Sequence, residues 1–256
     1  MPHVSGSFLD VPTPDGAADS YLVHPDDDAP HPAVLFYMDA FGPRPALRAM
    51  ADRLASAGYT VLVPNVFHRH GRAPVVDLPD FIDPAQRPEI FRQIRPAAAT
   101  LTPEAAVRDA GAYLEWLADS PLTTRGLVGV TGYCMGAGLA LRTAGGYPDR
   151  VAAMAGFHGA RLATDDENSP HLLADRVTAE LYFGHADGDS TNTPEMIARL
   201  ERALTTAGVR HRAEVYPGAQ HGFTQSDTAA YDHDATERHW AALIDLFDRT
   251  LPAGAR

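Results

Sequence analysis

Short apolar runs alternate along the chain with longer stretches in which apolar residues recur every three or four positions. The clearest short runs, at 33–37, 60–63 and 126–131, are rich in β-branched residues, as expected of parallel strands that are covered on both faces. Between them, apolar residues at i, i+3, i+4 and i+7 predict helices over 45–57 and 103–119. This alternation predicts an α/β fold, with a mostly parallel central sheet flanked by helices on both faces.

The same alternation continues to the end of the chain. The later expected elements are strands near 151–157, 180–183 and 211–216, and helices over 135–144, 194–207 and 234–250. Two early runs, 6–11 and 19–23, predict an N-terminal hairpin that turns at Asp15 and Gly16. We therefore expect a single α/β domain over residues 1–256.

Residues 64–101 do not follow this alternation. The segment is rich in proline and arginine and shows no sustained period, apart from a short helical turn expected near Phe91. A segment of this length inside a compact domain is typically a functional cap or lid. We expect residues 64–101, named here the cap segment, to cover a site; a solvated surface excursion is the alternative.

Composition narrows the classes of partner. The formal net charge is -12, with 33 acidic and 21 basic residues, which disfavours binding to nucleic acid or to an anionic membrane. The sequence shows no signal-peptide pattern and no apolar run of membrane-spanning length, so we expect a cytoplasmic protein. A single cysteine excludes an internal disulfide framework and a zinc site built from several cysteines. We expect neither a metal nor a cofactor, and a monomer or homodimer that acts on a small molecule.

The cysteine lies in a pattern that is typical of a nucleophile. Gly132-Tyr133-Cys134-Met135-Gly136 follows one expected strand directly and opens the next expected helix. This G-x-nucleophile-x-G order is that of a sharp strand-to-helix turn, with cysteine in place of serine. The helix N-terminus favours the thiolate form of Cys134 and offers backbone N–H groups to a developing oxyanion. A small buried cysteine between two packing glycines is the alternative.

A general base is expected after the last strand. In the hydrolase order nucleophile, acid, histidine, the base lies between the last strand and the C-terminal helix. His221, in a glycine-rich loop after the strand 211–216, holds that position. The alternative is an ordinary histidine of a surface loop.

Two aspartates compete for the role of the acid that orients this base. Asp187 and Asp189 both follow the strand near 180–183, at the carboxyl edge of the sheet where sites of open sheets gather. We favour Asp187, whose carboxylate would hold the imidazole of His221 in the productive tautomer. Asp189 would then be a solvated or helix-capping residue.

Taken together, three motifs resemble the dienelactone hydrolase (carboxymethylenebutenolidase) family: Gly132 to Gly136, Gly184 to Asp187, and His221 to Phe223. The likeness runs from about Ser7 to Leu251. It implies an α/β-hydrolase fold and the cleavage of an ester or lactone through an acyl group bound to Cys134.

The resemblance also implies an oxyanion hole. In the family a carboxylate follows the third strand close to the nucleophile, and the residue after that carboxylate lends an N–H group. In this chain, the resemblance places the carboxylate at Asp39 and the N–H donor at Ala40. Met135 would supply the other N–H group. The family residue is usually glutamate, and Asp39 is one methylene shorter.

Substrate contacts are harder to carry over. Family members that act on dienelactone hold its carboxylate with an arginine before the elbow and with a second arginine a few residues after the histidine. Gln225 stands at the second position, and Arg92 and Arg95 are candidates for the first. The remaining pocket candidates lie beside the motifs and are Tyr133, His158 and Phe223.

The sequence suggests three other interpretations. Class I glutamine amidotransferases also use a cysteine elbow, but they resemble G-x-C-x-G-x-Q followed by His-x-Glu, and here Gly138 and Gly222 break that pattern. His68 and His70 suggest a metal site, but no carboxylate or cysteine is spaced to complete it. A non-catalytic ligand-binding relative of the same fold remains the alternative to the hydrolase.

Overall fold

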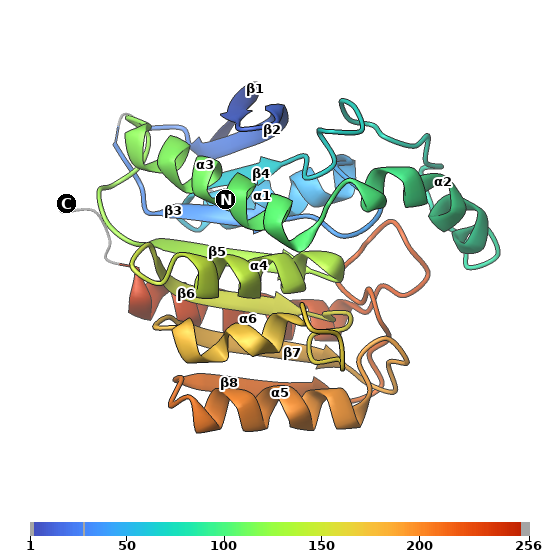
Figure 1. Cartoon of the computed structure of the whole chain (residues 1–256). Coiled ribbons are helices and arrows are strands. Elements are labelled where there is room, and N and C mark those ends of the chain that lie inside the picture. The colour runs from blue at the N-terminus through green and yellow to red at the C-terminus, as the bar shows by residue number, and fades with distance from the viewer. Residues whose placement is uncertain (1–2, 28, 252–256) are drawn as a thin grey trace.

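The computed structural model describes residues 3–27 and 29–251, which form an eight-stranded sheet with helices on both faces (Figure 1). The strands are β1 (Val4–Thr13), β2 (Gly16–Pro25), β3 (Ala33–Tyr37), β4 (Thr60–Pro64), β5 (Val128–Tyr133), β6 (Val151–Phe157), β7 (Glu180–Ala186) and β8 (His211–Tyr216). Their order across the sheet is β1-β2-β4-β3-β5-β6-β7-β8. The strands from β3 to β8 are parallel, whereas β1 and β2 form the predicted antiparallel hairpin at one edge.

The strand order reverses at β3. The chain passes from β3 to β4 on one side and returns to place β5 on the other side of β3, with Tyr37 paired to Gly132 near the carboxyl ends. Loops that leave the carboxyl ends of such strands diverge and leave a crevice, where ligands of open α/β sheets bind. The residues after β3 and after β5 therefore face the same crevice.

Helices cover both faces of the sheet. They are α1 (Pro45–Ser56), α2 (Arg87–Ala99), α3 (Pro103–Asp119), α4 (Met135–Gly146), α5 (Pro194–Thr206) and α6 (His233–Thr250), with a short 3-10 helix, η1 (Pro170–Arg176). Figure 1 shows α3, α4 and α5 in front of the sheet and α1 and α6 behind it. No helix in the described ranges is long and apolar enough to span a bilayer.

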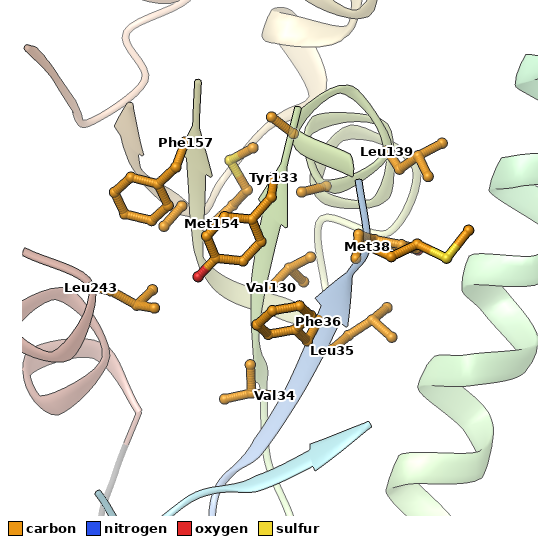
Figure 2. Close-up of a cluster of buried hydrophobic side chains, with 14 of the residues drawn as sticks. Val34, Leu35, Phe36, Met38, Val130, Tyr133, Leu139, Met154, Phe157 and Leu243 are labelled. Atoms are coloured by element: carbon orange, nitrogen blue, oxygen red, sulfur yellow. The ribbon is translucent and has the colours of Figure 1, made fainter. Parts of the chain in front are cut away.

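Aromatic and aliphatic side chains fill the space between the sheet and these helices (Figure 2). Phe36, Tyr133 and Phe157 are fully buried, and the rings of Tyr133 and Phe157 stack with their centroids 5.7 Å apart. Each side chain of this size contributes roughly 1.5–3 kcal/mol through the apolar surface it removes from water. This packing fixes the strand that carries the elbow.

The predicted helices and strands are confirmed with ends that differ by up to three residues, and two of the differences have a clear physical reason. Strand β5 begins two residues later than expected, because Leu127 is 46% exposed and does not enter the sheet core. The cap segment contains the full helix α2, where the sequence analysis predicted only a short helical turn near Phe91. Helix α2 buries Ile90, Ile94 and Ala97 and continues through Pro96.

The cap segment lies beyond the carboxyl ends of the parallel strands (Figure 1). Ile82 forms an isolated parallel bridge with Thr228, and the Ile82 N–H donates to the Asp227 carbonyl oxygen over 2.8 Å. The cap segment is therefore hydrogen-bonded to the β8–α6 loop (residues 217–232), which follows the last strand.

Candidate active site

The elbow has the strained geometry that its pattern predicts. Cys134 stands between β5 and α4 with φ 54 and ψ -116, a conformation that L-residues adopt only where the surrounding structure enforces it. A Cβ on Gly132 would lie 2.1 Å from the Gly136 carbonyl oxygen, and one on Gly136 would lie 2.4 Å from the Met38 oxygen. Both glycines are required because the turn brings backbone against backbone.

Two backbone N–H groups are available for an oxyanion. Met135 is the first residue of α4, and Ala40 lies in the β3–α1 loop (residues 38–44), which runs against the elbow at Gly136. Within the described residues, neither the Met135 N–H nor the Ala40 N–H donates to a protein acceptor. A helix N-terminus adds a favourable dipole for negative charge at this position.

His221 is held by a carboxylate from the neighbouring loop. Its Nδ1 lies 2.6 Å from Oδ2 of Asp189 and 3.3 Å from the Thr191 hydroxyl. Thr191 also donates to Asp189 from its hydroxyl over 2.7 Å and from its backbone N–H over 2.8 Å. The carboxylate of Asp189 is therefore fixed by three donors, and it fixes the imidazole in turn.

The expectation that Asp187 performs this task is wrong. Oδ2 of Asp187 accepts a hydrogen bond from the Gly218 N–H over 2.9 Å, and the Asp187 N–H donates to the Ala219 carbonyl oxygen over 2.8 Å. Asp187 thus joins the loop after β7 to the loop after β8. Gly188, with φ +62, turns the chain between the two aspartates.

The electrostatics of the site favour a charged imidazole. Burial alone would lower the pKa of His221, but hydrogen bonds with Asp189 and with the Cys134 side chain outweigh it and raise the pKa to about 10. Burial raises the pKa of Asp189, whereas the hydrogen bond and charge of His221 outweigh that effect and keep it below its ordinary value.

Asp39 does not extend towards the nucleophile. It is completely buried, and its Oδ1 accepts from Arg44 Nη1 and from the Phe41 N–H, each over 2.8 Å. Its Oδ2 accepts from Gln225 Nε2 over 2.5 Å. No hydrogen bond joins Asp39 to Cys134 in the described part of the chain. The glutamine at the expected arginine position therefore contacts the short carboxylate.

Three of the proposed pocket residues occupy other places. The Tyr133 ring is buried on the α6 side, where its hydroxyl lies 2.9 Å from His239 Nε2. Arg92 is exposed and pairs with Glu89 three residues earlier. Arg95 is exposed on the same helix. These three predictions are wrong, because Tyr133 points into the core and the two arginines lie on the outer side of α2.

His158 and Phe223 are buried next to the base rather than exposed in a pocket. The ring centroid of His158 lies 5.3 Å from that of His221 and 5.1 Å from that of Phe223. Its Nε2 lies 2.8 Å from the Thr224 hydroxyl. Burial, and next the charge of His221, lower the pKa of His158 well below its ordinary value. A neutral His158 therefore packs against the charged His221.

Arg87 was missed by the sequence analysis. It stands at the first position of α2, and its Nε is buried with no hydrogen-bond partner among the described residues. Its guanidinium carbon lies 5.7 Å from the centroid of Phe41, and its charge reaches His158. A buried guanidinium donor that lacks a protein acceptor is suited to binding an anionic group. Pro88 and Glu89, a proline at the start and an acidic residue in the first turn, were the local signals that a helix begins there.

A groove of about 1280 Å³ lies at the opposite edge of the sheet. His31, Tyr59 and Thr123, which precede β3, β4 and β5, are among its lining residues. Cys134 and His221 are not among its lining residues.

A mostly parallel eight-stranded sheet, covered on both faces and carrying a cysteine on a strained strand-to-helix elbow, defines the class of α/β-hydrolases. The sequence profile of the dienelactone hydrolase family matches residues 18–251. The chain therefore belongs to the dienelactone hydrolase family and is a hydrolase.

Individual relatives agree with this family. The carboxymethylenebutenolidase of Rhodococcus opacus is 28% identical over 92% of this chain and 88% of its own length. A dienelactone hydrolase-like promiscuous phosphotriesterase from metagenomic libraries has a TM-score of 0.75 at 22% identity, over 97% of this chain and 99% of its own. The dienelactone hydrolase of Anabaena variabilis has a TM-score of 0.69 at 22% identity over the same shares. The two solved structures show the likeness of fold.

Proposed function

We propose that the protein hydrolyses an activated ester or a lactone through an acyl group on Cys134, with His221 as acid and base and Asp189 as the orienting carboxylate. The observation that carries the proposal is the 2.6 Å contact of Asp189 with His221, in a structure where Cys134 stands on a strained strand-to-helix elbow. A nucleophile on an elbow, together with a histidine held by a carboxylate, is the recurring arrangement of acyl transfer.

The first half-reaction forms the thioester. The Cys134 thiolate attacks the carbonyl carbon, and the oxygen takes the negative charge towards the N–H groups of Met135 and Ala40. The carbon–oxygen bond to the leaving group then breaks as the protonated His221 donates its proton to the departing oxygen. Because a thiolate is expelled more readily than a poor alkoxide, the enzyme needs a good leaving group such as an enol or a phenol.

The second half-reaction releases the acid. Neutral His221 takes a proton from water, and the hydroxide attacks the thioester carbonyl while the same N–H groups hold the oxyanion. Collapse of the intermediate expels the Cys134 thiolate beside the reprotonated imidazole. The enzyme has returned to its starting charge state, and one water has been consumed.

The substrate carries an anionic group. The Nε of Arg87 is buried without a hydrogen-bond partner among the described residues, and its guanidinium lies over the Phe41 ring. Leaving such a donor without an acceptor costs free energy. Since Phe41 directly follows Ala40, a carboxylate at Arg87 would place the carbonyl of a small lactone near the oxyanion donors. Dienelactone, which carries a carboxylate, fits this description.

The test is steady-state hydrolysis of dienelactone and of p-nitrophenyl acetate by the wild type and by Cys134→Ala, with mass spectrometry of the quenched wild type. We expect turnover of both substrates, an acyl adduct on Cys134, and no turnover by the variant. A wild type that binds dienelactone without hydrolysing it would instead identify a non-catalytic binding protein. A variant that keeps its rate would remove Cys134 from the mechanism.

A further inference from the structure

One guanidinium joins the two loops that carry the oxyanion donor and the base. Arg44 Nη1 donates to Asp39 Oδ1 over 2.8 Å, within the β3–α1 loop that carries Ala40. Arg44 Nε donates to Asp227 Oδ2 over 2.5 Å and Nη2 donates to Oδ1 over 3.2 Å, within the β8–α6 loop that carries His221. The arginine side chain is only 5% exposed.

This arginine stands at an unfavourable place for a cation. It is the N-cap residue of α1, where it makes no side-chain capping hydrogen bond and where the helix dipole repels positive charge. Burial alone would lower the pKa of Arg44, but the nearby charges of Asp39 and Asp227 outweigh it and hold the pKa above its ordinary value. Arg44 is therefore unfavourable for the local helix, yet its guanidinium is fully hydrogen-bonded in the interior. This combination points to a role in the site.

The shape of the β3–α1 loop depends on the carboxylate that Arg44 holds. Oδ1 of Asp39 accepts the Phe41 N–H over 2.8 Å, and Oδ2 accepts Gln225 Nε2. The peptide between Asp39 and Phe41 presents the Ala40 N–H, which is left without a protein acceptor among the residues described. Rotating the Asp39 carboxylate would rotate this turn, and with it the direction of the Ala40 N–H.

We propose that Arg44 is a positioning residue for the oxyanion hole: by holding Asp39 against Asp227, it aims the Ala40 N–H at the position of the developing oxyanion. The inference rests on the proposed hydrolase function. It assigns Asp39 to the support of the oxyanion donor and away from direct contact with the thiol. It also gives Gln225 a defined task, since its amide completes the donors around Asp39.

The test compares two reactions of the same thiol. Acylation of Cys134 by p-nitrophenyl acetate develops an oxyanion, whereas alkylation by iodoacetamide displaces iodide at a saturated carbon and develops none. Single-turnover acylation and alkylation rates are measured by mass spectrometry for the wild type and Arg44→Lys, because lysine keeps the charge but cannot bond to both carboxylates as a fork. Arg53→Lys is the matched control, since Arg53 lies on α1 and forms a two-pronged pair with Glu237 outside the site.

We expect Arg44→Lys to slow acylation about 10- to 100-fold, because a misaimed oxyanion donor loses most of its effect, and to leave alkylation within about threefold of the wild type. Arg53→Lys should change neither rate. If Arg44→Lys does not fold, Asp227→Asn, at a side chain that is 15% exposed, should weaken the same support and slow acylation selectively.

Two outcomes would overturn the role of Arg44 and leave the proposed hydrolase intact. In the first, folded Arg44→Lys and folded Asp227→Asn are both acylated at the wild-type rate. In the second, the acylation and alkylation rates of the variants fall by the same factor. Parallel loss would mean that the network acts on the thiol and the base rather than on the oxyanion donor. A wild-type Cys134 that is alkylated but never acylated would instead overturn the proposed hydrolase, and the inference with it.

Discussion

Asp189, and not Asp187, contacts His221: its Oδ2 lies 2.6 Å from the imidazole Nδ1. The two aspartates are separated by Gly188 alone, whose φ of +62 sends their side chains to different partners. Asp187 accepts from the Gly218 backbone, and Asp189 takes the imidazole. One aspartate therefore fixes the loop and the other fixes the base.

The assignment of the acid predicts a sharp difference between two conservative variants. Asp189→Asn should lower kcat for p-nitrophenyl acetate by about 10²- to 10⁴-fold, because an amide donor would favour the wrong imidazole tautomer. Asp187→Asn keeps an oxygen acceptor for Gly218 and should stay within about threefold of the wild type, as expected for a neutral hydrogen bond. Steady-state kinetics decide between them; a larger loss in Asp187→Asn would return Asp187 to the catalytic set.

The geometry of the elbow predicts that the stability of the fold requires glycine at positions 132 and 136. Gly132→Ala and Gly136→Ala should destabilise the fold by about 3 kcal/mol or more, since each Cβ would overlap backbone atoms that cannot move cheaply. Gly138→Ala is the control, because its nearest neighbour, the Pro170 side chain, lies 3.6 Å from the added Cβ. Urea unfolding measures all three; equal stabilities would contradict the described elbow.

Arg87 predicts selectivity for charge in the substrate. Arg87→Gln should lower kcat/KM for dienelactone about 10- to 100-fold, the loss of a charge-assisted hydrogen bond. The same variant should hydrolyse the neutral p-nitrophenyl acetate at nearly the wild-type rate. Arg92→Gln, on the exposed side of α2, serves as the control. Equal losses on both substrates in Arg87→Gln would indicate a structural effect instead of a contact with the substrate.

The raised pKa of His221 predicts a pH dependence with a definite sign. Its pKa of about 10 lies above the ordinary 6.5, so the protonated form stabilises the fold below pH 6.5, and this stabilisation disappears as the pH rises through 10. The unfolding free energy of the wild type should therefore fall as the pH rises from 6.5 to 10. The fall should be smaller in Asp189→Asn. In Cys134→Ala, NMR titration of His221 should give a lower pKa than in the wild type, because one of the hydrogen bonds that raise it is gone. An unchanged value would show that the thiol does not contribute.

Much of the fold and the two central site residues could be predicted from the sequence because their determinants are local. The strand before Cys134, the two glycines and the following helix are contiguous, and the place of His221 follows from the order of elements. The choice between Asp187 and Asp189 could not be made in this way, since it depends on the backbone angle of Gly188. The sequence favoured Asp187, and only the turn at Gly188 shows that Asp189 is the aspartate that reaches His221.

The contacts of the cap segment could not be predicted from the sequence either. Helix α2 has prolines near its start and inside it and only three buried apolar residues, so its period is weak in the sequence. Without the helix start, nothing distinguished Arg87 from Arg92 and Arg95. The pairing of Asp39 with Arg44 and Gln225 was hidden for a related reason, because it joins segments that are far apart in the sequence.

The bridge between Ile82 and Thr228 has a consequence for engineering. A cap taken from another family member and grafted over residues 64–101 would arrive without the backbone partner that it had in its parent, and the β8–α6 loop of this chain would lose its own. Recombined enzymes should therefore inherit the cap segment and residues 222–228 from the same parent. Libraries that shuffle the two independently will mostly sample mismatched pairs, and their losses will fall on the loop that holds His221.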